Sequence, residues 1–536
     1  MSMFSTGLSG LNAAQRALGA TSNNISNLFT PGYNRELPKL SETGVGGGVR
    51  VDAIERQFNT YVANQLNNAR TQSSALETYS NQVSQIDNLL ADREAGLSPL
   101  MQDFFSSLDA LASAPSDPAA RQGVIGAADT LSAQFRSFDG YLQDMQSNIN
   151  GQIRDEVTQI NNTVDQIADF NREISLARAR SGEAPNSLLN QRDQLVAELN
   201  ERMDLRLNVQ DGKSYNISLP NGQPLVTGTA SFKLEAIPAE NDPQRTVIGY
   251  RNGTNKTTVL DEATITGGSL GGLMSFRAET LDRTQNQLGQ IAVSLSVAFN
   301  EQHKQGIDLN GEQGGDFFSV RAPQGFAHDK NIGSAEATLS FDADNIAELK
   351  AVDYSIKFDG DVPVVTRKDN GQTVESDWQS GTLAFGGIEM TFSSQPASGD
   401  RFEVQPVRRA GAGMETAIRD LDRIAAGEED ASGDNRNARK LQDLQSDNIV
   451  GGRASLSGAY GALVSDVGNR TNITQVNLEA RQGLTDQLRA VQQSESGVNL
   501  DEEAANLIRY QQFYMANARV IDTAGTIMDT ILNLRS

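Results

Sequence analysis

Residues 124–174 read VIGAADTLSAQFRSFDGYLQDMQSNINGQIRDEVTQINNTVDQIADFNREI, and this stretch decides the fold. Its apolar residues recur every three or four positions, at Val124, Ala128, Leu131, Phe135, Phe138, Leu142, Met145, Ile149, Ile153, Val157, Ile160, Val164, Ile167 and Ile174. Side chains at this spacing form a seam along one side of an α-helix, and such a seam needs partner helices. Two successive four-residue steps after Ile149 resemble a stutter, which locally unwinds a supercoil. The stretch therefore predicts a long helix within a helical body.

The positions of proline extend this prediction to most of the chain, because proline is excluded from helix interiors. Four long windows contain none: residues 39–98, 119–184, 244–322 and 407–536. Most of them carry an apolar repeat of three or four residues, which is typical of amphipathic helices. A heptad row over residues 58–90 predicts a second helix of about 35 residues. After Pro406 the pattern again predicts helices, with an interruption near residues 427–437.

Two segments alternate apolar and polar residues instead, which is typical of β-strands. The first, about 204–267, includes Leu205 to Val209 and the turn signal Asp211-Gly212. The second, about 325–409, alternates from Tyr354 to Phe358 and holds the chain's one tryptophan, Trp378, which we expect in its core. The predicted fold class is multidomain α+β: a long helical bundle or coiled-coil body, formed by amino- and carboxyl-terminal segments, with two inserted β-rich domains. This order brings the two chain ends side by side.

The predicted divisions follow these changes of pattern. They are a terminal helix segment at 1–55, the first part of the helical body at 56–203, a first β-rich domain at 204–267, a returning helical segment at 268–324, a second β-rich domain at 325–410, the last part of the body at 411–496, and a terminal helix at 497–536. Near the end of the first body segment, Asn186 and Ser187 offer an amino-terminal cap for a shorter helix.

Both ends carry narrow apolar rows. A helix at the carboxyl end is predicted to begin after Asn499, which stands three residues before Glu502 as in a capping box. The candidate assembly residues on the two rows are Phe4, Leu8, Leu11, Leu18, Ile25, Leu507, Tyr514, Ile521, Met528 and Leu532. Two interpretations stay open: the rows pair only with each other within one monomer, or they bind neighbouring subunits.

Composition excludes several classes of function. The 536 residues carry a formal charge of −23, the wrong sign for binding nucleic acid or anionic lipid. There is no cysteine, so disulfides and thiolate metal sites are excluded, and two histidines leave little for imidazole chemistry. Neither a secretory signal nor an apolar run of about 20 residues is visible. We therefore expect no cofactor, no metal, no nucleic acid partner and no membrane segment, and composition leaves few of the usual parts of an enzyme.

Short motifs then point to a family. Residues 22–27, SNNISN, and 30–35, TPGYNR, resemble the amino-terminal signature of bacterial flagellar axial proteins, the rod, hook and hook-associated family. Further stretches narrow the resemblance to the first of the two proteins at the junction between hook and filament. They are GGSLGGL at 267–273, NEQH at 300–303, GIDLNG at 306–311, GDNRNA at 433–438 and VNLDEEAANL at 498–507.

The resemblance implies a non-catalytic structural subunit that is needed for filament assembly. It would form a ring of identical subunits, with the hook protein below and the second junction protein above. It would leave the cytoplasm through the flagellar type III channel, without a cleaved signal, and end at the extracellular hook-filament junction. A cytoplasmic export chaperone would first cover the carboxyl-terminal helix, at Tyr510, Tyr514, Ile521, Met528 and Leu532.

Other interpretations of the motifs are weaker. The chain could be another axial component, flagellin or the second junction protein. Gly267-x-Ser269-x-Gly271 matches the nucleophile elbow of serine hydrolases, with His328 downstream, but the predicted sheets are not parallel. Asp308-x-Asn310-x-Glu312 resembles the start of a calcium loop without its later ligands, so a turn is favoured. His303, at the end of a predicted helix, is more typical of a capping or interface residue than of a ligand.

Overall fold

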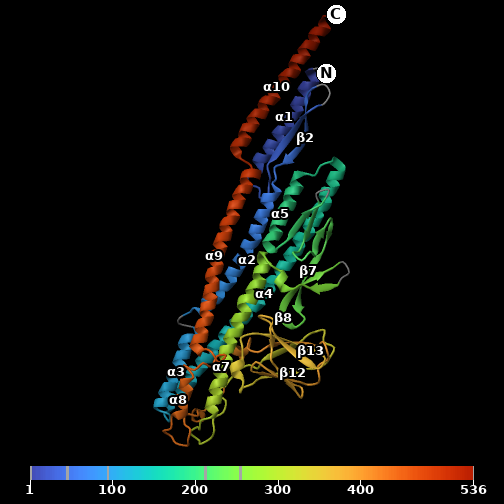
Figure 1. Ribbon diagram of the computed structural model, residues 1–536. Helices are drawn as coiled ribbons and strands as arrows, with labels where there is room; N and C mark the ends of the chain where they lie inside the picture. The colour runs from blue at the N-terminus through green and yellow to red at the C-terminus, as the bar shows by residue number, and fades with distance from the viewer. Residues whose placement is uncertain (1–2, 44–46, 93–95, 211–213, 253–255, 535–536) are drawn as a thin grey trace.

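The computed structural model describes residues 3–43, 47–92, 96–210, 214–252 and 256–534. Figure 1 shows an elongated helical body with both chain termini at one end and two β-rich regions along one side. The α+β prediction, with helical ends and two β-rich insertions, is confirmed. Among the described residues, no helix is both long and apolar enough to cross a membrane.

Long helices build the body. Their bounds are α2 (Thr60–Leu90), α3 (Leu97–Ser113), α4 (Pro118–Ser181), α5 (Asn186–Arg202), α6 (Gly268–Phe276), α7 (Asp282–Lys304), α8 (Arg436–Asp443) and α9 (Leu456–Ser496), with a π-helical turn, Arg277–Leu281, between α6 and α7. The 64-residue α4 begins where Asp117 accepts a hydrogen bond from Ala119 N and ends at Gly182, whose φ of 81° is left-handed. All the seam residues predicted on α4 are buried, so that prediction is confirmed.

The first β-rich region, residues 204–267, lies against α4. Its antiparallel strands form one sheet in the order β3-β4-β5-β6 and another in the order β7-β8-β9. They are β3 (Arg206–Val209), β4 (Tyr215–Ser218), β5 (Pro224–Thr227), β6 (Ala230–Ser231), β7 (Lys233–Ala239), β8 (Asp242–Arg251) and β9 (Thr257–Val259). Ile217, Val226 and Ile248 belong to the same apolar core as the body helices. This region is therefore continuous with the body.

The second β-rich region, residues 325–410, has a separate apolar core. Its two antiparallel sheets run β11-β19-β13-β14-β15 and β12-β18-β17-β16. Their strands are β11 (Gln324–Ala327), β12 (Ala337–Phe341), β13 (Tyr354–Asp359), β14 (Val362–Arg367), β15 (Thr373–Val374), β16 (Asp377–Gln379), β17 (Thr382–Phe385), β18 (Ile388–Phe392) and β19 (Arg401–Gln405). Trp378 packs edge-on against Phe358 and Phe392, and it is half-buried at the edge of the core rather than within it.

The segment between the second β-rich region and the predicted interruption at 427–437, residues 411–426, departs from the sequence prediction, which made it helical. It holds the 3₁₀ turns Ala410–Gly413 and Leu421–Arg423, and β20 (Glu415–Thr416), which pairs with β10 (Phe318–Ser319). Arg121 of α4 fixes it by donating to the carbonyls of Leu421 and Ile424, at 2.7 and 3.0 Å. These tertiary contacts therefore determine the conformation of the segment, although its apolar spacing alone favours a helix.

The two chain ends lie side by side, as predicted. They consist of α1 (Met3–Ser26), the hairpin of β1 (Glu36–Glu42) and β2 (Val49–Arg56), and α10 (Leu500–Asn533). The predicted cap is confirmed, because the Asn499 side chain accepts from the backbone N–H groups of Asp501 and Glu502. The cap predicted at Asn186 or Ser187 is wrong: α5 starts at Asn186, whose amide instead donates to Ile54 O.

Candidate assembly interface at the two chain ends

The terminal helices pack through small residues. The buried positions of α1 are Gly7, Gly10, Ala13, Ala14, Ala17, Ala20, Thr21 and Asn24. Most of them recur every three or four residues, so they form one stripe along the helix. The β1–β2 hairpin also packs against α1. Thus α1 lies between α10 and the hairpin.

Two glycines set how closely α1 and α10 approach. A Cβ atom added to Gly7 would lie 2.8 Å from Ile521 Cγ1, and one added to Gly10 would lie 2.2 Å from Asn517 Oδ1. Real Cβ atoms do not come so close to other heavy atoms. The two helices therefore pack at a distance that these glycines permit.

A buried polar cluster joins the lower ends of the two helices. The Asn24 amide donates to Glu503 Oε2 at 3.0 Å, and Arg35 pairs with the other oxygen of Glu503 at 2.7 Å. Arg35 also pairs with Glu502 at 2.6 Å. The Tyr33 hydroxyl donates to Asn24 Oδ1 at 2.8 Å. All five residues lie in the two terminal stretches that carry the family resemblance.

Burial and charge both act on this cluster. Burial raises the pKa of Tyr33, and the nearby carboxylates of Glu36 and Glu503 raise it further. Burial alone would lower the pKa of Arg35, but its hydrogen bonds to Glu502 and Glu503 leave that pKa raised. The tyrosine thus stays neutral and the guanidinium charged, which keeps the cluster hydrogen-bonded over the ordinary pH range.

The candidate residues from the sequence divide into two sets. Leu11, Leu18, Ile25, Leu507 and Ile521 are half-buried, and Tyr510 is buried. Ile521 packs beside Gly7 of α1. The exposed set is Phe4, Leu8, Tyr514, Met528 and Leu532.

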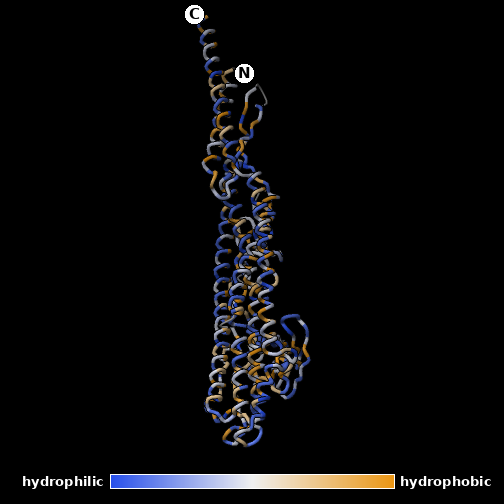
Figure 2. Tube along the Cα trace, turned by 90° about the vertical axis from the view of Figure 1, so that its left-hand side faces the viewer, coloured by the Kyte–Doolittle hydropathy of each residue, from blue (hydrophilic) through white to orange (hydrophobic). Residues whose placement is uncertain are grey.

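Sequence reasoning missed a second apolar row on α10. Phe513, Val520, Ile527 and Leu534 follow at intervals of seven, with Ile531 beside them, and all are exposed. The heptad spacing itself could have revealed this row, which runs next to the predicted one. Figure 2 shows hydrophobic positions continuing along both terminal helices beyond the body. The ends therefore present more apolar surface than their mutual packing covers.

An apolar groove lies between the far ends of the two helices. Its lining includes Phe4 of α1 and Ile527, Met528 and Ile531 of α10, and it encloses about 510 Å³. Exposed apolar surface of this kind marks contact sites on other proteins. The groove and the second row are thus the part of the site left open in a single chain.

Family models match four parts of the chain. The model described as the flagellar hook-associated protein FlgK helical domain covers residues 83–318, and the hook-associated protein 1 D2-like domain covers 326–406. The ends match the flagellar basal body rod protein at 4–34 and the basal body rod FlgEFG protein C-terminal model at 492–534.

Curated relatives agree over their full length. The chain is 43% identical to flagellar hook-associated protein 1 of Escherichia coli K12, with all of both chains covered. It is 41% identical to the protein of that name from Salmonella typhimurium, again over all of both. The chain belongs to the flagellar hook-associated protein 1 family. The flagellar hook junction protein FlgK from Burkholderia pseudomallei has the same fold: its structure has a TM-score of 0.75 and 27% identity, and the match covers 80% of this chain and all of that one.

Hook-associated protein 1 is a structural junction protein of the bacterial flagellum and not an enzyme. The interpretation of Ser269 as the nucleophile of a hydrolase is therefore wrong. Ser269 lies in α6, packed against α2, and a 3₁₀ turn rather than a strand precedes it. His328 lies in the second β-rich region, where it contacts Glu240 at 3.3 Å. The glycines around Ser269 instead permit a tight turn from the first β-rich region into α6, since Gly267 and Gly268 have φ angles of 72° and 64°.

The remaining motifs are also accounted for by packing. His303 is buried, accepts from Ala425 N–H through Nε2 at 2.9 Å and donates from Nδ1 to Gly315 O at 2.7 Å. Asp308 Oδ1 accepts from the backbone N–H groups of Asn310 and Glu312, which is the predicted turn. Across the described residues, no group of three His, Asp or Glu side chains could hold a metal ion.

Proposed function

We propose that the chain forms the junction ring between hook and filament, on which the filament assembles. In this ring identical subunits meet at their terminal helices, the hook protein lies below and the second junction protein lies above. The observation that carries the proposal is the mode of packing at the ends. Because α1 packs on α10 through glycine and alanine, large apolar side chains of both helices, among them Phe4 and Met528, remain exposed for neighbouring subunits.

The acidic composition suits the same arrangement. A formal charge of −23 keeps the protein soluble and discourages indiscriminate association. The termini would form the inner tube while the β-rich regions face outward, in line with the position of those regions on one side of the body.

The route to this site is also part of the proposal. Export through the flagellar type III channel would need no cleaved signal, and a chain without cysteine forms no disulfide that could impede its passage. A cytoplasmic chaperone would cover Tyr510, Tyr514, Ile521, Met528 and Leu532 beforehand. Three of these five side chains, those of Tyr514, Met528 and Leu532, are exposed on the folded α10, where they would otherwise invite premature association.

The assembly proposal is tested by placing a charge on the second apolar row. Ile527 is 45% exposed in the single chain, so Ile527→Asp should leave the monomer folded and abolish its incorporation. The matched control is Ile332→Asp in the second β-rich region, since Ile332 is 87% exposed. Cells carrying each variant would be labelled with gold-coupled antibody against residues 325–410 and viewed by electron microscopy.

We expect a gold band between hook and filament for the control and the unmodified chain, and no band for Ile527→Asp. Normal filaments with a normal band from Ile527→Asp would disprove assembly through this row. Label along the whole filament would instead favour a flagellin-like subunit.

Export is tested separately. Tyr514→Asp together with Met528→Asp should abolish co-purification of the chain with its cytoplasmic chaperone and reduce the amount of chain in the culture medium. Co-purification and export at the unmodified level would refute a chaperone site on this face of α10.

A further inference from the structure

The second β-rich region is attached to the rest of the chain by a small apolar contact with α7 and by several polar contacts. Its apolar core is separate from the core shared by the body and the first β-rich region. Val293 and Val297 of α7 reach into this core, and Gly289 of α7 lies against Val407 where the chain leaves the region. Hydrophobic contact has no preferred direction. These few residues therefore hold the region against α7 but do not set the angle between the region and the body.

A ladder of six alternating charges runs beside this attachment. In order it consists of Arg277, Glu262, Arg245, Asp282, Arg408 and Asp353. Three guanidinium and three carboxylate groups give it no net charge. Arg277 is fully buried, and Arg408 and Asp353 are nearly so. Such a buried row persists only when each charge is paired.

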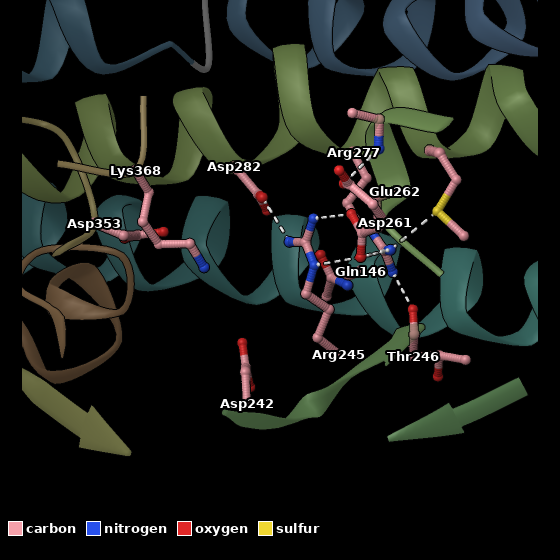
Figure 3. A network of polar contacts seen from close by, with 12 residues as sticks. Gln146, Asp242, Arg245, Thr246, Asp261, Glu262, Arg277, Asp282, Asp353 and Lys368 are labelled. Atoms are coloured by element: carbon pink, nitrogen blue, oxygen red, sulfur yellow. Dashed lines mark hydrogen bonds and ion pairs between the residues drawn. The ribbon is translucent and has the colours of Figure 1, made fainter. Parts of the chain in front are cut away.

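Asp282, at the start of α7, is the centre of the ladder. Its Oδ2 accepts from Arg245 of β8 at 2.7 Å, and its Oδ1 accepts from Arg408, which follows β19, at 2.8 Å. Arg408 then pairs with Asp353, directly before β13. Figure 3 shows Arg245 between Asp282 and Glu262. One carboxylate of the body thus joins both β-rich regions.

The other half of the ladder stays within the body and the first region. Arg245 donates to both oxygens of Glu262, at 3.2 and 2.8 Å. Arg277, in the π-helical turn, donates to Glu262 at 2.8 Å and to Thr246 O at 2.7 Å. Glu262 therefore has the same chemistry as Asp282 but no partner in the second region.

A second polar contact lies between the two β-rich regions. Gln405 donates to Asp242 Oδ2 at 2.9 Å, and Asn241 is hydrogen-bonded to Glu403. Glu240 pairs with Lys330 at 2.5 Å. Hydrogen bonds to charged groups are directional, so these contacts form only at a particular angle between the two regions. The same holds for the ion pairs of the guanidinium groups.

We propose that the Asp282–Arg408–Asp353 part of the ladder is a clamp that holds the second β-rich region at one angle to the body. Without the clamp the region stays folded on its own core but changes its angle to the body. The motion takes place in the two chain segments that connect the region to the body, near residues 320–324 and 405–410. Asp282 is thus a positioning residue, whose effect is on the arrangement of folded parts.

The absence of cysteine makes a direct test practical, because two introduced cysteines carry the only spin labels. One label replaces Asp361, exposed in the turn between β13 and β14, and the other replaces Asn148, exposed on α4. Pulsed electron spin resonance of the full chain then measures the distance distribution between the second region and the body.

Asp282→Asn should broaden this distribution at least twofold or add a second peak, and Asp353→Asn should do the same from the far end of the clamp. Glu262→Gln, the matched control, should leave it narrow. Trp378, the chain's one tryptophan, reports whether the second region is still folded, and its emission should be unchanged in all three variants.

A narrow distribution in both Asp282→Asn and Asp353→Asn would overturn the proposal. So would a broadening in Glu262→Gln equal to theirs, because the effect would then be a general loss of stability. A red-shifted Trp378 emission in both clamp variants would also overturn it, since the ladder would then be needed for folding and not for the angle.

Discussion

Arg35 and Glu503 are 468 positions apart in the sequence, yet the guanidinium and the carboxylate lie 2.7 Å from each other. Their contact joins the loop after α1 to the first turn of α10. Arg35 N also donates to Ser496 O at 2.9 Å, so the chain ends meet where they leave the body.

Glu503→Gln should destabilise the paired ends by about 1–3 kcal/mol, because Arg35 keeps Glu502 but loses its buried carboxylate partner, and Asn24 loses a charged acceptor. Glu503 is 1% exposed. Its neighbour Glu502 binds the same arginine but is 58% exposed, so Glu502→Gln should cost less than about 1 kcal/mol. Hydrogen exchange of α1 and α10 amides in the purified chain measures both. Equal effects of the two substitutions would show that burial at Glu503 contributes nothing.

Gly10→Leu should separate α1 from α10, because a side chain there collides with Asn517. We expect overpacking to cost about 1–3 kcal/mol, which is about a fivefold to 150-fold increase in exchange rate. Gly19 lies on the same helix, and a Cβ atom added there would have no neighbouring atom within 4 Å, so Gly19→Leu is the control. If both variants exchange at the unmodified rate, close glycine packing is not what holds the helices together.

Stability should fall on mild acidification because of His303. Burial lowers the pKa of its imidazole from the ordinary 6.5, so the unfolded chain takes up the proton first. The free energy of unfolding therefore decreases as the pH falls below about 6.5, by up to about 1.4 kcal/mol per pH unit. Urea unfolding at pH 7.5, 6.5 and 5.5 measures this slope. His303→Gln should flatten it, and an unchanged slope in this variant would contradict the assignment.

Arg121→Leu should loosen the irregular segment after Pro406. Besides the carbonyls of Leu421 and Ile424, the Arg121 side chain binds Pro115 O at 2.6 Å, and all three acceptors would lose their donor. Unsatisfied buried groups cost about 1–3 kcal/mol each, so limited proteolysis should cut within residues 411–435. Arg419, whose side chain is 70% exposed, provides the control Arg419→Ala. Equal resistance of Arg121→Leu and the unmodified chain would count against this role.

The body could be predicted from sequence because its seam is local. From Val124 to Ile174 each apolar residue lies three, four or seven positions from the next, and one helix brings them all to one side. The alternating strands of the second β-rich region are equally local, as at Tyr354 to Phe358. In both cases the pattern specifies the element and its buried face.

The terminal site was only partly accessible to the same reasoning. The large residues of α1, such as Phe4 and Leu8, drew attention to the face that a single chain leaves open. The face that packs in the single chain is built from Gly7, Gly10 and several alanines, which carry little hydropathy signal. Their role depends on how closely α10 approaches, and no spacing within α1 gives that distance.

The side-by-side chain ends were predicted, but individual side-chain contacts between distant segments were not predictable. Asp282, Arg408 and Asp353 come from three separate elements, and each alone resembles an ordinary surface charge in the sequence. The same is true of Arg121 and the segment after Pro406, where one buried arginine fixes a backbone that apolar spacing alone assigned to helix.

The unbroken course of α4 has a mechanical meaning. Its 64 residues span about 96 Å at 1.5 Å per residue, and its apolar seam is buried along this length. A helix packed in this way acts as a stiff strut. Twist or load applied at the terminal end is therefore transmitted along the strut with little loss. The segments near residues 27–35 and 405–410 contain no α-helix, so we expect more compliance there than along α4.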